Sequence, residues 1–202
     1  MMVEQRGAVA RGRRATVGPH TTPKAAMSDT PTEKKIDELH ALIEKMGIAM
    51  LTTRRPDGRL VTRPMAVQKR IDAADLWFVT NVEANKVDEL EFDPNVNVGL
   101  YDPDSTEWVS VSGTATLTQD RAKIHELYAP DWRAWFGDEG GERDGGPDDP
   151  RLALIFVDAD SAFYTKAKHS KPVQLFEIAR GILTGSKPDV GREERLTEGD
   201  LA

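Results

Sequence analysis

The stretch EWVSVSGTATLT, residues 107–118, decides the fold class. Side chains that favour opposite environments alternate along it, so that Trp108 and Ser110 share one face while Val109 and Val111 share the other. A period of two is typical of a β-strand with one buried face. The stretch therefore predicts a long strand that lies against a core.

Shorter strands and a few helices are expected on both sides of this strand. Most of the connections are short and carry turn residues, as in the sequence Pro-Asp-Gly at 56–58. The other strands are predicted over residues 48–54, 60–69, 75–81, 96–101, 152–157 and 162–167. Helices are predicted at 31–46, 83–92, 120–128 and along an apolar stripe over 175–183. This order indicates an α+β fold, with a mostly antiparallel β-barrel and peripheral helices.

Both ends of the chain differ in composition from the middle. Residues 1–26 contain no leucine, isoleucine or aromatic residue, and we expect residues 1–27 to form a disordered leader. Residues 28–185 form the expected domain, and the polar residues 186–202 are expected to be a frayed, disordered tail. Within the domain, the glycine-rich and acidic residues 137–150 predict a flexible surface loop that does not pack.

Charge and composition exclude several classes of function. Lysine and arginine total 27 against 34 acidic residues, a net charge of −7, which argues against a nucleic-acid partner. No apolar run approaches the roughly 20 residues of a membrane span, so no membrane partner is expected. The chain has no cysteine, which fits a cytoplasmic protein. The four histidines lack metal-ligand spacing, and no metal site is predicted.

The first candidate site is the sequence RPMAVQ, residues 63–68. Pro64 cannot donate a ladder hydrogen bond, so this strand must lie at an edge or open locally. An open strand leaves backbone groups free for a flat ligand, with Arg63 and Met65 on one face. A plain edge strand with a solvated arginine would explain the same residues.

The second candidate site is the sequence WFVTN, residues 77–81, followed by Lys86. Here an apolar strand ends in a hydroxyl and an amide, and a short helix begins with a lysine in its first turn. Helix N-termini attract anions, and Thr80 and Lys86 would complete a phosphate site. An ordinary helix cap with an exposed lysine is the alternative interpretation.

In this order, the sequences RPM, WFVTN and WVSVSGTA resemble the pyridoxamine 5′-phosphate oxidase-like flavoproteins, and in particular their general stress protein branch. The resemblance covers roughly residues 33–185. It implies a split β-barrel homodimer with a flavin at the dimer interface. The cofactor it implies is FMN, with FAD or a deazaflavin as the alternatives.

The resemblance also implies which residues bind the flavin. Arg63 and Lys86 would hold the phosphate, with Thr80 as a hydroxyl donor after Val79. Backbone groups of Pro64, Met65, Ala66, Val67 and Gln68 would lie along the ring. Trp108 and Ser110 would flank the same cavity, and the partner subunit would contribute an aromatic ring near Tyr164.

The substrate is less well defined by the resemblance than the cofactor. True pyridoxamine phosphate oxidases carry a C-terminal arginine motif, whereas residues 163–169 here read FYTKAKH. We therefore expect no such oxidase activity. The resemblance implies an FMN-dependent oxidoreductase that acts on an unknown small substrate in a stress response. Non-catalytic flavin storage or sensing, and a deazaflavin-dependent reductase, remain open alternatives.

Overall fold

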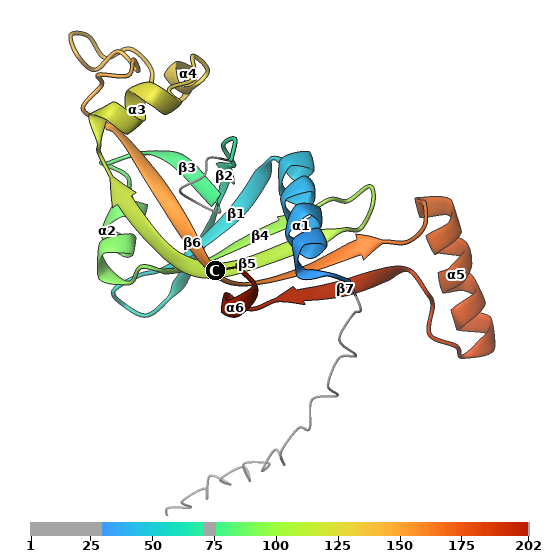
Figure 1. Ribbon diagram of the computed structural model, residues 1–202. Coiled ribbons are helices and arrows are strands. Elements are labelled where there is room, and N and C mark those ends of the chain that lie inside the picture. The colour runs from blue at the N-terminus through green and yellow to red at the C-terminus, as the bar shows by residue number, and fades with distance from the viewer. Residues whose placement is uncertain (1–29, 71–75, 202) are drawn as a thin grey trace, which may run out of the picture.

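The computed structural model describes residues 30–70 and 76–201 (Figure 1). The predicted leader, residues 1–27, lies outside the described residues. The strands are β1 (Ile48–Arg54), β2 (Leu60–Ala66), β3 (Leu76–Asn81), β4 (Asn95–Tyr101), β5 (Trp108–Thr118), β6 (Leu152–Ala167) and β7 (Gly191–Leu196). The helices are α1 (Thr32–Met46), α2 (Asn85–Phe92), α3 (Arg121–Leu127), α4 (Trp132–Phe136), α5 (Lys171–Thr184) and α6 (Glu198–Leu201).

All the strand pairs are antiparallel, and the strand order is β2-β1-β4-β5-β6-β3. Strand β3 pairs with the first half of β6, and β7 pairs with its second half. Strands β2 and β3 therefore stand at the two ends of a sheet that curls into a barrel. Close to this seam, the backbone N–H of Gln68 donates to the carbonyl of Trp77 at 3.2 Å. The predicted α+β class, a mostly antiparallel split β-barrel with peripheral helices, is confirmed.

The two strands predicted at 152–157 and 162–167 are one strand, β6, because both halves pair with β5. The register of this pair shifts between Ser112 and Gly113. A Cβ on Gly113 would lie 2.0 Å from the carbonyl oxygen of Asp158, so only glycine fits at this bend. The bend lets β5 and β6 turn around the barrel.

Helix α1 closes one side of the barrel with Leu39, Leu42 and Ile43, which belong to the main hydrophobic core. It ends at Gly47 with φ 69°, as its sequence predicts. Burial of each such leucine or isoleucine stabilises the fold by about 1.5–3 kcal/mol. This packing fixes the start of β1, which directly follows the helix.

The prediction of a disordered tail over residues 186–202 is wrong. Residues 191–196 pair with β6, and Leu196 is fully buried. Charged residues of this strand are stabilised by ion pairs to α1, where Arg192 contacts Glu38 at 2.6 Å and Glu194 contacts Lys35 at 3.3 Å. The polar composition misled because these charges are paired across elements rather than solvated.

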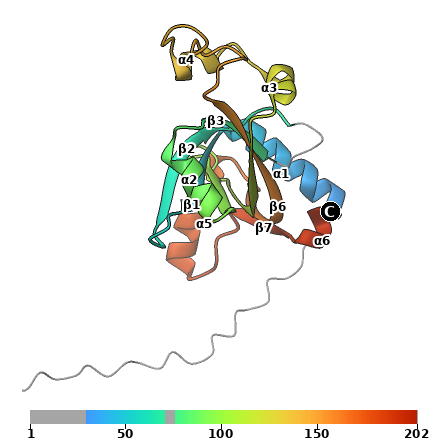
Figure 2. The same ribbon diagram turned by 90° about the vertical axis from the view of Figure 1, so that its left-hand side faces the viewer.

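The acidic loop also differs from its prediction, because its C-terminal end packs. Asp149 is fully buried, and its carboxylate accepts a hydrogen bond from the N–H of Gly145 at 2.8 Å. The partner of this carboxylate is Arg151, whose side chain is only 2% exposed, at 2.7 Å. Together with α3 and α4, this loop forms an insertion at one end of the barrel (Figure 2).

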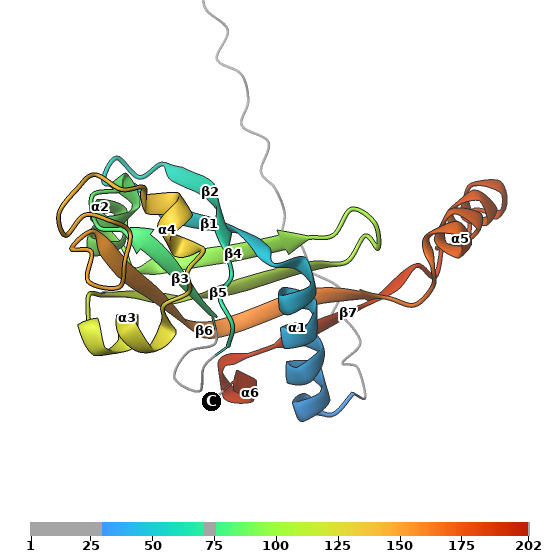
Figure 3. The same cartoon turned by 90° about the horizontal axis from the view of Figure 1, so that it is seen from above.

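Helix α5 projects beyond β6 and β7, away from the barrel (Figure 3). The predicted helix is present, but its apolar stripe does not pack in this chain. Among its residues, Ile182 is 79% and Leu183 is 86% exposed, and Gln174 is the one buried residue. The side chain of Gln174 accepts a hydrogen bond from the Oγ1 of Thr106 at 2.9 Å and donates to the carbonyl of Ser105 at 3.3 Å, which attaches the start of α5 to the connection between β4 and β5.

Candidate functional site

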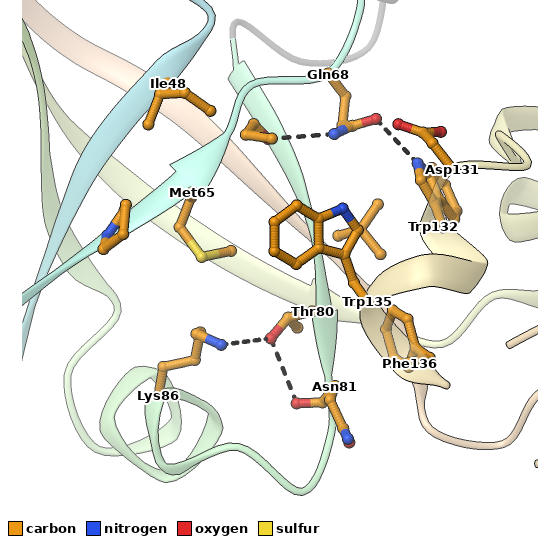
Figure 4. Close-up of a pocket in the computed structure, with 13 residues that line it drawn as sticks. Ile48, Met65, Gln68, Thr80, Asn81, Lys86, Asp131, Trp132, Trp135 and Phe136 are labelled. Carbon is orange, nitrogen blue, oxygen red and sulfur yellow. Dashed lines mark hydrogen bonds between the residues drawn. The ribbon is translucent and has the colours of Figure 1, made fainter. Parts of the chain in front are cut away.

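A cavity of about 340 Å³ lies between β2 and β3, where the barrel is split. Figure 4 shows the residues that line this cavity. The lining is drawn from β1, β2, β3, α2 and α4 and consists of Ile48, Pro64, Met65, Ala66, Gln68, Val79, Thr80, Asn81, Lys86, Asp131, Trp132, Trp135 and Phe136. The cavity is mostly apolar with a few polar groups, which is the usual character of a small-molecule site.

One end of the cavity is cationic. Lys86, in the first turn of α2, points toward the end of β3, and its Nζ donates to the Oγ1 of Thr80 at 3.1 Å (Figure 4). Burial lowers the pKa of Lys86, and the nearby positive charge of Arg63 lowers it further. An ammonium in this setting gains most from an anionic ligand, because an anion would offset both the burial and the repulsion.

Arg63 lies behind this lysine and does not line the cavity. Its guanidinium pairs with the buried carboxylate of Glu89 on α2, and it donates to the Oγ1 of Thr53 at 2.5 Å. The Thr53 hydroxyl itself donates to Glu89 at 2.5 Å. The cluster of Arg63, Glu89 and Thr53 thus attaches α2 to the β1–β2 hairpin and fixes the position of Lys86.

The backbone of β2 forms one wall of the cavity. Pro64 and Ala66 face the outside of the barrel, while the buried side chain of Met65 points inward. Pro64 lies opposite Met50 in the register, on the side of β2 that pairs with β1. The other edge of β2 has no strand partner among the described residues, so the expected opening along this strand is present.

The opposite wall comes from α4, a helix that was not predicted from the sequence. Trp132 is 2% exposed and packs edge-on against Trp77, with ring centroids 6.1 Å apart. Trp135 and Phe136 follow it and also line the cavity. A signal was available, because the sequence DWRAWF at 131–136 places three aromatic residues beside an otherwise acidic and glycine-rich loop.

Seven of the twelve predicted site residues line the cavity: Pro64, Met65, Ala66, Gln68, Val79, Thr80 and Lys86. Val67 does not line it and is instead a partly buried residue packed against the main core. Trp108 and Ser110 lie on the outer face of β5, which is separated from β2 by β1 and β4. Ser110 there accepts a hydrogen bond from the Nδ2 of Asn97 at 2.9 Å.

Tyr164 is the clearest departure from the predicted site. Its side chain is fully buried in the core of its own subunit, and its hydroxyl donates to Glu38 on α1 at 3.2 Å. Burial and the neighbouring Glu38 raise the pKa of this tyrosine well above its usual range. A side chain enclosed in this way cannot contact the flavin of a partner subunit, so this prediction is wrong.

The split barrel, with a cationic end and an apolar wall in its seam, can be compared with known proteins. The profile of the family described as "Pyridoxamine 5′-phosphate oxidase like" matches residues 34–189. The chain belongs to this family. The match spans all the strands except the last, and it includes every residue that lines the cavity.

Two proteins show the extent of the similarity. Protein bli-3 of Neurospora crassa is 33% identical over 177 residues, which is 86% of this chain and 85% of bli-3. The structure of a candidate general stress protein 26 from Jannaschia sp. CCS1 has a TM-score of 0.62 and 25% identity, covering 82% of this chain and 99% of its own. The resemblance to the general stress protein branch is thereby confirmed.

A more distantly similar protein is an FMN-binding protein. A pyridoxamine 5′-phosphate oxidase-related, FMN-binding protein from Nostoc punctiforme has a TM-score of 0.52 and 14% identity, covering 82% of this chain and 94% of its own. At this identity the similarity shows the fold alone.

In the part of the chain that the structure describes, no helix is long and apolar enough to cross a membrane. Those residues also contain no cluster of three or more potential metal ligands.

Proposed function

We propose that this chain binds FMN in the cavity between β2 and β3. The observation that carries the proposal is the desolvated ammonium of Lys86 at one end of an otherwise apolar cavity, hydrogen-bonded to the neutral hydroxyl of Thr80. FMN combines a flat, largely apolar ring with a dianionic phosphate. The phosphate suits the cationic end, and the ring suits the β2 wall.

Arg63 has a different role in this proposal from the direct contact that the sequence predicted. Its guanidinium already pairs with Glu89, so it supplies positive charge behind Lys86 and holds α2 in position. Lys86 and Thr80 are therefore the residues we assign to the phosphate. The FMN-binding relative from Nostoc punctiforme, which shares the fold, supports the choice of cofactor.

We further propose that the holoprotein is an oxidoreductase that acts on a small molecule. A bound flavin supplies hydride and electron transfer, and the protein contributes binding, orientation and electrostatics. Pro64–Gln68 would position the ring, and the apolar side chains of Met65 and Val79 would exclude water from it. Asp131 is the one carboxylate among the described lining residues, so the chemistry would depend on the flavin itself.

We also propose that the protein is a homodimer, with the flavin site close to the interface. The outer sheet face next to the cavity exposes Ile48, Met50 and Tyr101, and α5 exposes a second apolar surface. Monomers rarely expose contiguous apolar patches beyond a few hundred Å². In a symmetric pair, each copy could cover the exposed faces of the other. Trp108 and Ser110, on the same outer face, would then approach the partner's cavity.

The cofactor assignment is tested by titrating apo-protein with FMN, with FAD and with a deazaflavin, while the visible absorption is followed. We expect FMN to bind most tightly, because the cationic end offers space and charge for a terminal phosphate. The proposal would be contradicted if the deazaflavin bound more tightly than FMN, or if none of the three ligands bound. Bleaching of the bound FMN by NADH or NADPH would then favour the oxidoreductase over a flavin store.

A further inference from the structure

The aromatic residues of α4 differ sharply in their surroundings. Trp132 is buried against Trp77 and Tyr128, with the ring centroid of Tyr128 at 5.5 Å. Trp135, one turn later, is 83% exposed. In Figure 4 its indole extends from α4 over the middle of the cavity, toward Met65 on the opposite wall. Of the two tryptophans at the cavity, Trp135 is thus the one that the described part of the chain leaves largely uncovered.

The short helix that carries Trp135 is fixed at both ends. At its start, the indole Nε1 of Trp132 donates to the Oε1 of Gln68 at 3.1 Å. At its end, the buried Arg151 donates to the carbonyl oxygens of Phe136 at 2.9 Å and Gly137 at 3.0 Å. Five residues alone would not hold a helix in water. The hydrogen bonds of Gln68 and Arg151 therefore determine where Trp135 stands.

Arg151 also holds the acidic loop, because it pairs with Glu139 at 2.7 Å and donates to the carbonyl of Arg143 at 3.1 Å. Burying a guanidinium is costly, and its pairing with Asp149 at 2.7 Å offsets that cost without requiring any contact to α4. The contacts to the α4 carbonyls are additional, and they keep the helix beside the cavity. A fixed helix that presents one exposed tryptophan over an apolar cavity is an arrangement suited to a flat aromatic ligand.

We propose that Trp135 is the aromatic residue with which this chain contacts the ring system of the bound flavin, and that Arg151 is a positioning residue for it. This inference rests on the proposed function, because the ligand it names is the same flavin. It replaces the aromatic contact that the sequence assigned to Tyr164. The ring would then lie between two walls of the same subunit, one formed by β2 and the other by α4.

The contact with the ring can be separated from the contact with the phosphate by using two ligands. Riboflavin has the same ring as FMN but no phosphate. Trp135→Ala should weaken the binding of both FMN and riboflavin by about tenfold, which corresponds to about 1.4 kcal/mol. Trp135→Phe should retain most of the affinity for both. The matched control is Phe92→Ala, because Phe92 is also exposed but does not line the cavity.

The visible circular dichroism of the bound flavin provides a second measurement, because it reports the asymmetric surroundings of the ring. Its signal should change in Trp135→Ala and remain unchanged in Phe92→Ala. The inference is overturned if Trp135→Ala binds both ligands as the wild type does. It is also overturned if the variant alters only the oligomeric state, which would assign Trp135 to a partner surface. If the wild type binds neither ligand, the proposed function fails together with the inference.

Discussion

The indole Nε1 of Trp132 donates a 3.1 Å hydrogen bond to the side-chain oxygen of Gln68. This bond joins α4 to the second residue after β2, across the seam where the barrel is split. The backbone N–H of the same glutamine donates to the carbonyl of Trp77 at 3.2 Å. Gln68 therefore connects the end of β2 with α4 and with β3, the three elements on either side of the cavity.

The ion pair of Arg63 and Glu89 should be important for stability. Arg63→Ala leaves the carboxylate of Glu89 buried without its partner, which typically costs about 3–5 kcal/mol. Urea denaturation of the apo-protein should show this loss, and Arg63→Leu combined with Glu89→Leu should recover much of it. Arg59→Ala, at an exposed pair, is the control and should change the unfolding free energy by less than about 1 kcal/mol. Equal effects for the two arginines would contradict this role.

As the pH is raised, the affinity for FMN should begin to fall at a lower pH than it would with a lysine of ordinary pKa. Burial and Arg63 lower the pKa of Lys86 from the usual value of about 10.4, and the phosphate prefers the protonated amine. As pH rises through this lowered pKa, the ammonium is lost and FMN binding weakens. Titrations between pH 7 and 10 should show the decline for FMN but not for riboflavin. Lys86→Arg should remove it, because a guanidinium stays protonated in this range.

Acid should weaken the insertion through Asp149. The pairing of Asp149 with Arg151 lowers its pKa to about 2 in the folded protein, below the usual value of about 3.9 for an aspartate. A carboxyl with a lowered pKa contributes stability that is present above its unfolded pKa and is lost as pH falls through its folded pKa. Between pH 4 and 2, the wild type should lose about 2 kcal/mol more than Asp149→Asn. Parallel curves for the two proteins would show that the pair does not contribute in this way.

The homodimer should depend on the exposed apolar surface of α5. Replacing Ile182 and Leu183 with glutamate adds charge to two side chains that are already exposed, so the fold of the subunit should be retained. Sedimentation velocity at micromolar concentration should give a dimer for the wild type and a monomer for this double variant. Phe92→Glu, at an exposed position in α2 that belongs neither to the outer sheet face nor to α5, is the control and should remain dimeric. A monomeric wild type, or a dimeric double variant, would contradict the proposed interface.

Much of the fold could be predicted from local sequence patterns. The alternation along β5 and the turn at Pro56–Gly58 identify strands directly, and Gly47 marks the end of α1 with its positive φ. Residues 191–196 could not be identified in this way, because their charges are stabilised by partners on α1 that are more than 150 residues away in sequence. Long-range pairing of this kind leaves no local pattern.

The candidate site shows the same division. Thr80 and Lys86 are six residues apart, so their contact follows from a strand that ends where a helix begins. Glu89 could have been inferred, since it lies on the same face of α2 as Lys86, but its partner Arg63 comes from another hairpin. The place of Trp135 at the cavity could not be predicted, because its helix is held by contacts with Arg151 and Gln68 rather than by its own sequence.

The comparison of FMN with riboflavin in wild type and Lys86→Ala tests the central claim most directly. A charge-assisted contact is worth about 1.5–3 kcal/mol, so Lys86→Ala should weaken FMN binding by roughly ten- to hundredfold and riboflavin binding very little. Lys34→Ala, at an exposed position in α1, should bind both ligands as the wild type does. If Lys86→Ala and Lys34→Ala bind FMN equally well, the phosphate lies elsewhere and the assignment of the cavity between β2 and β3 is wrong.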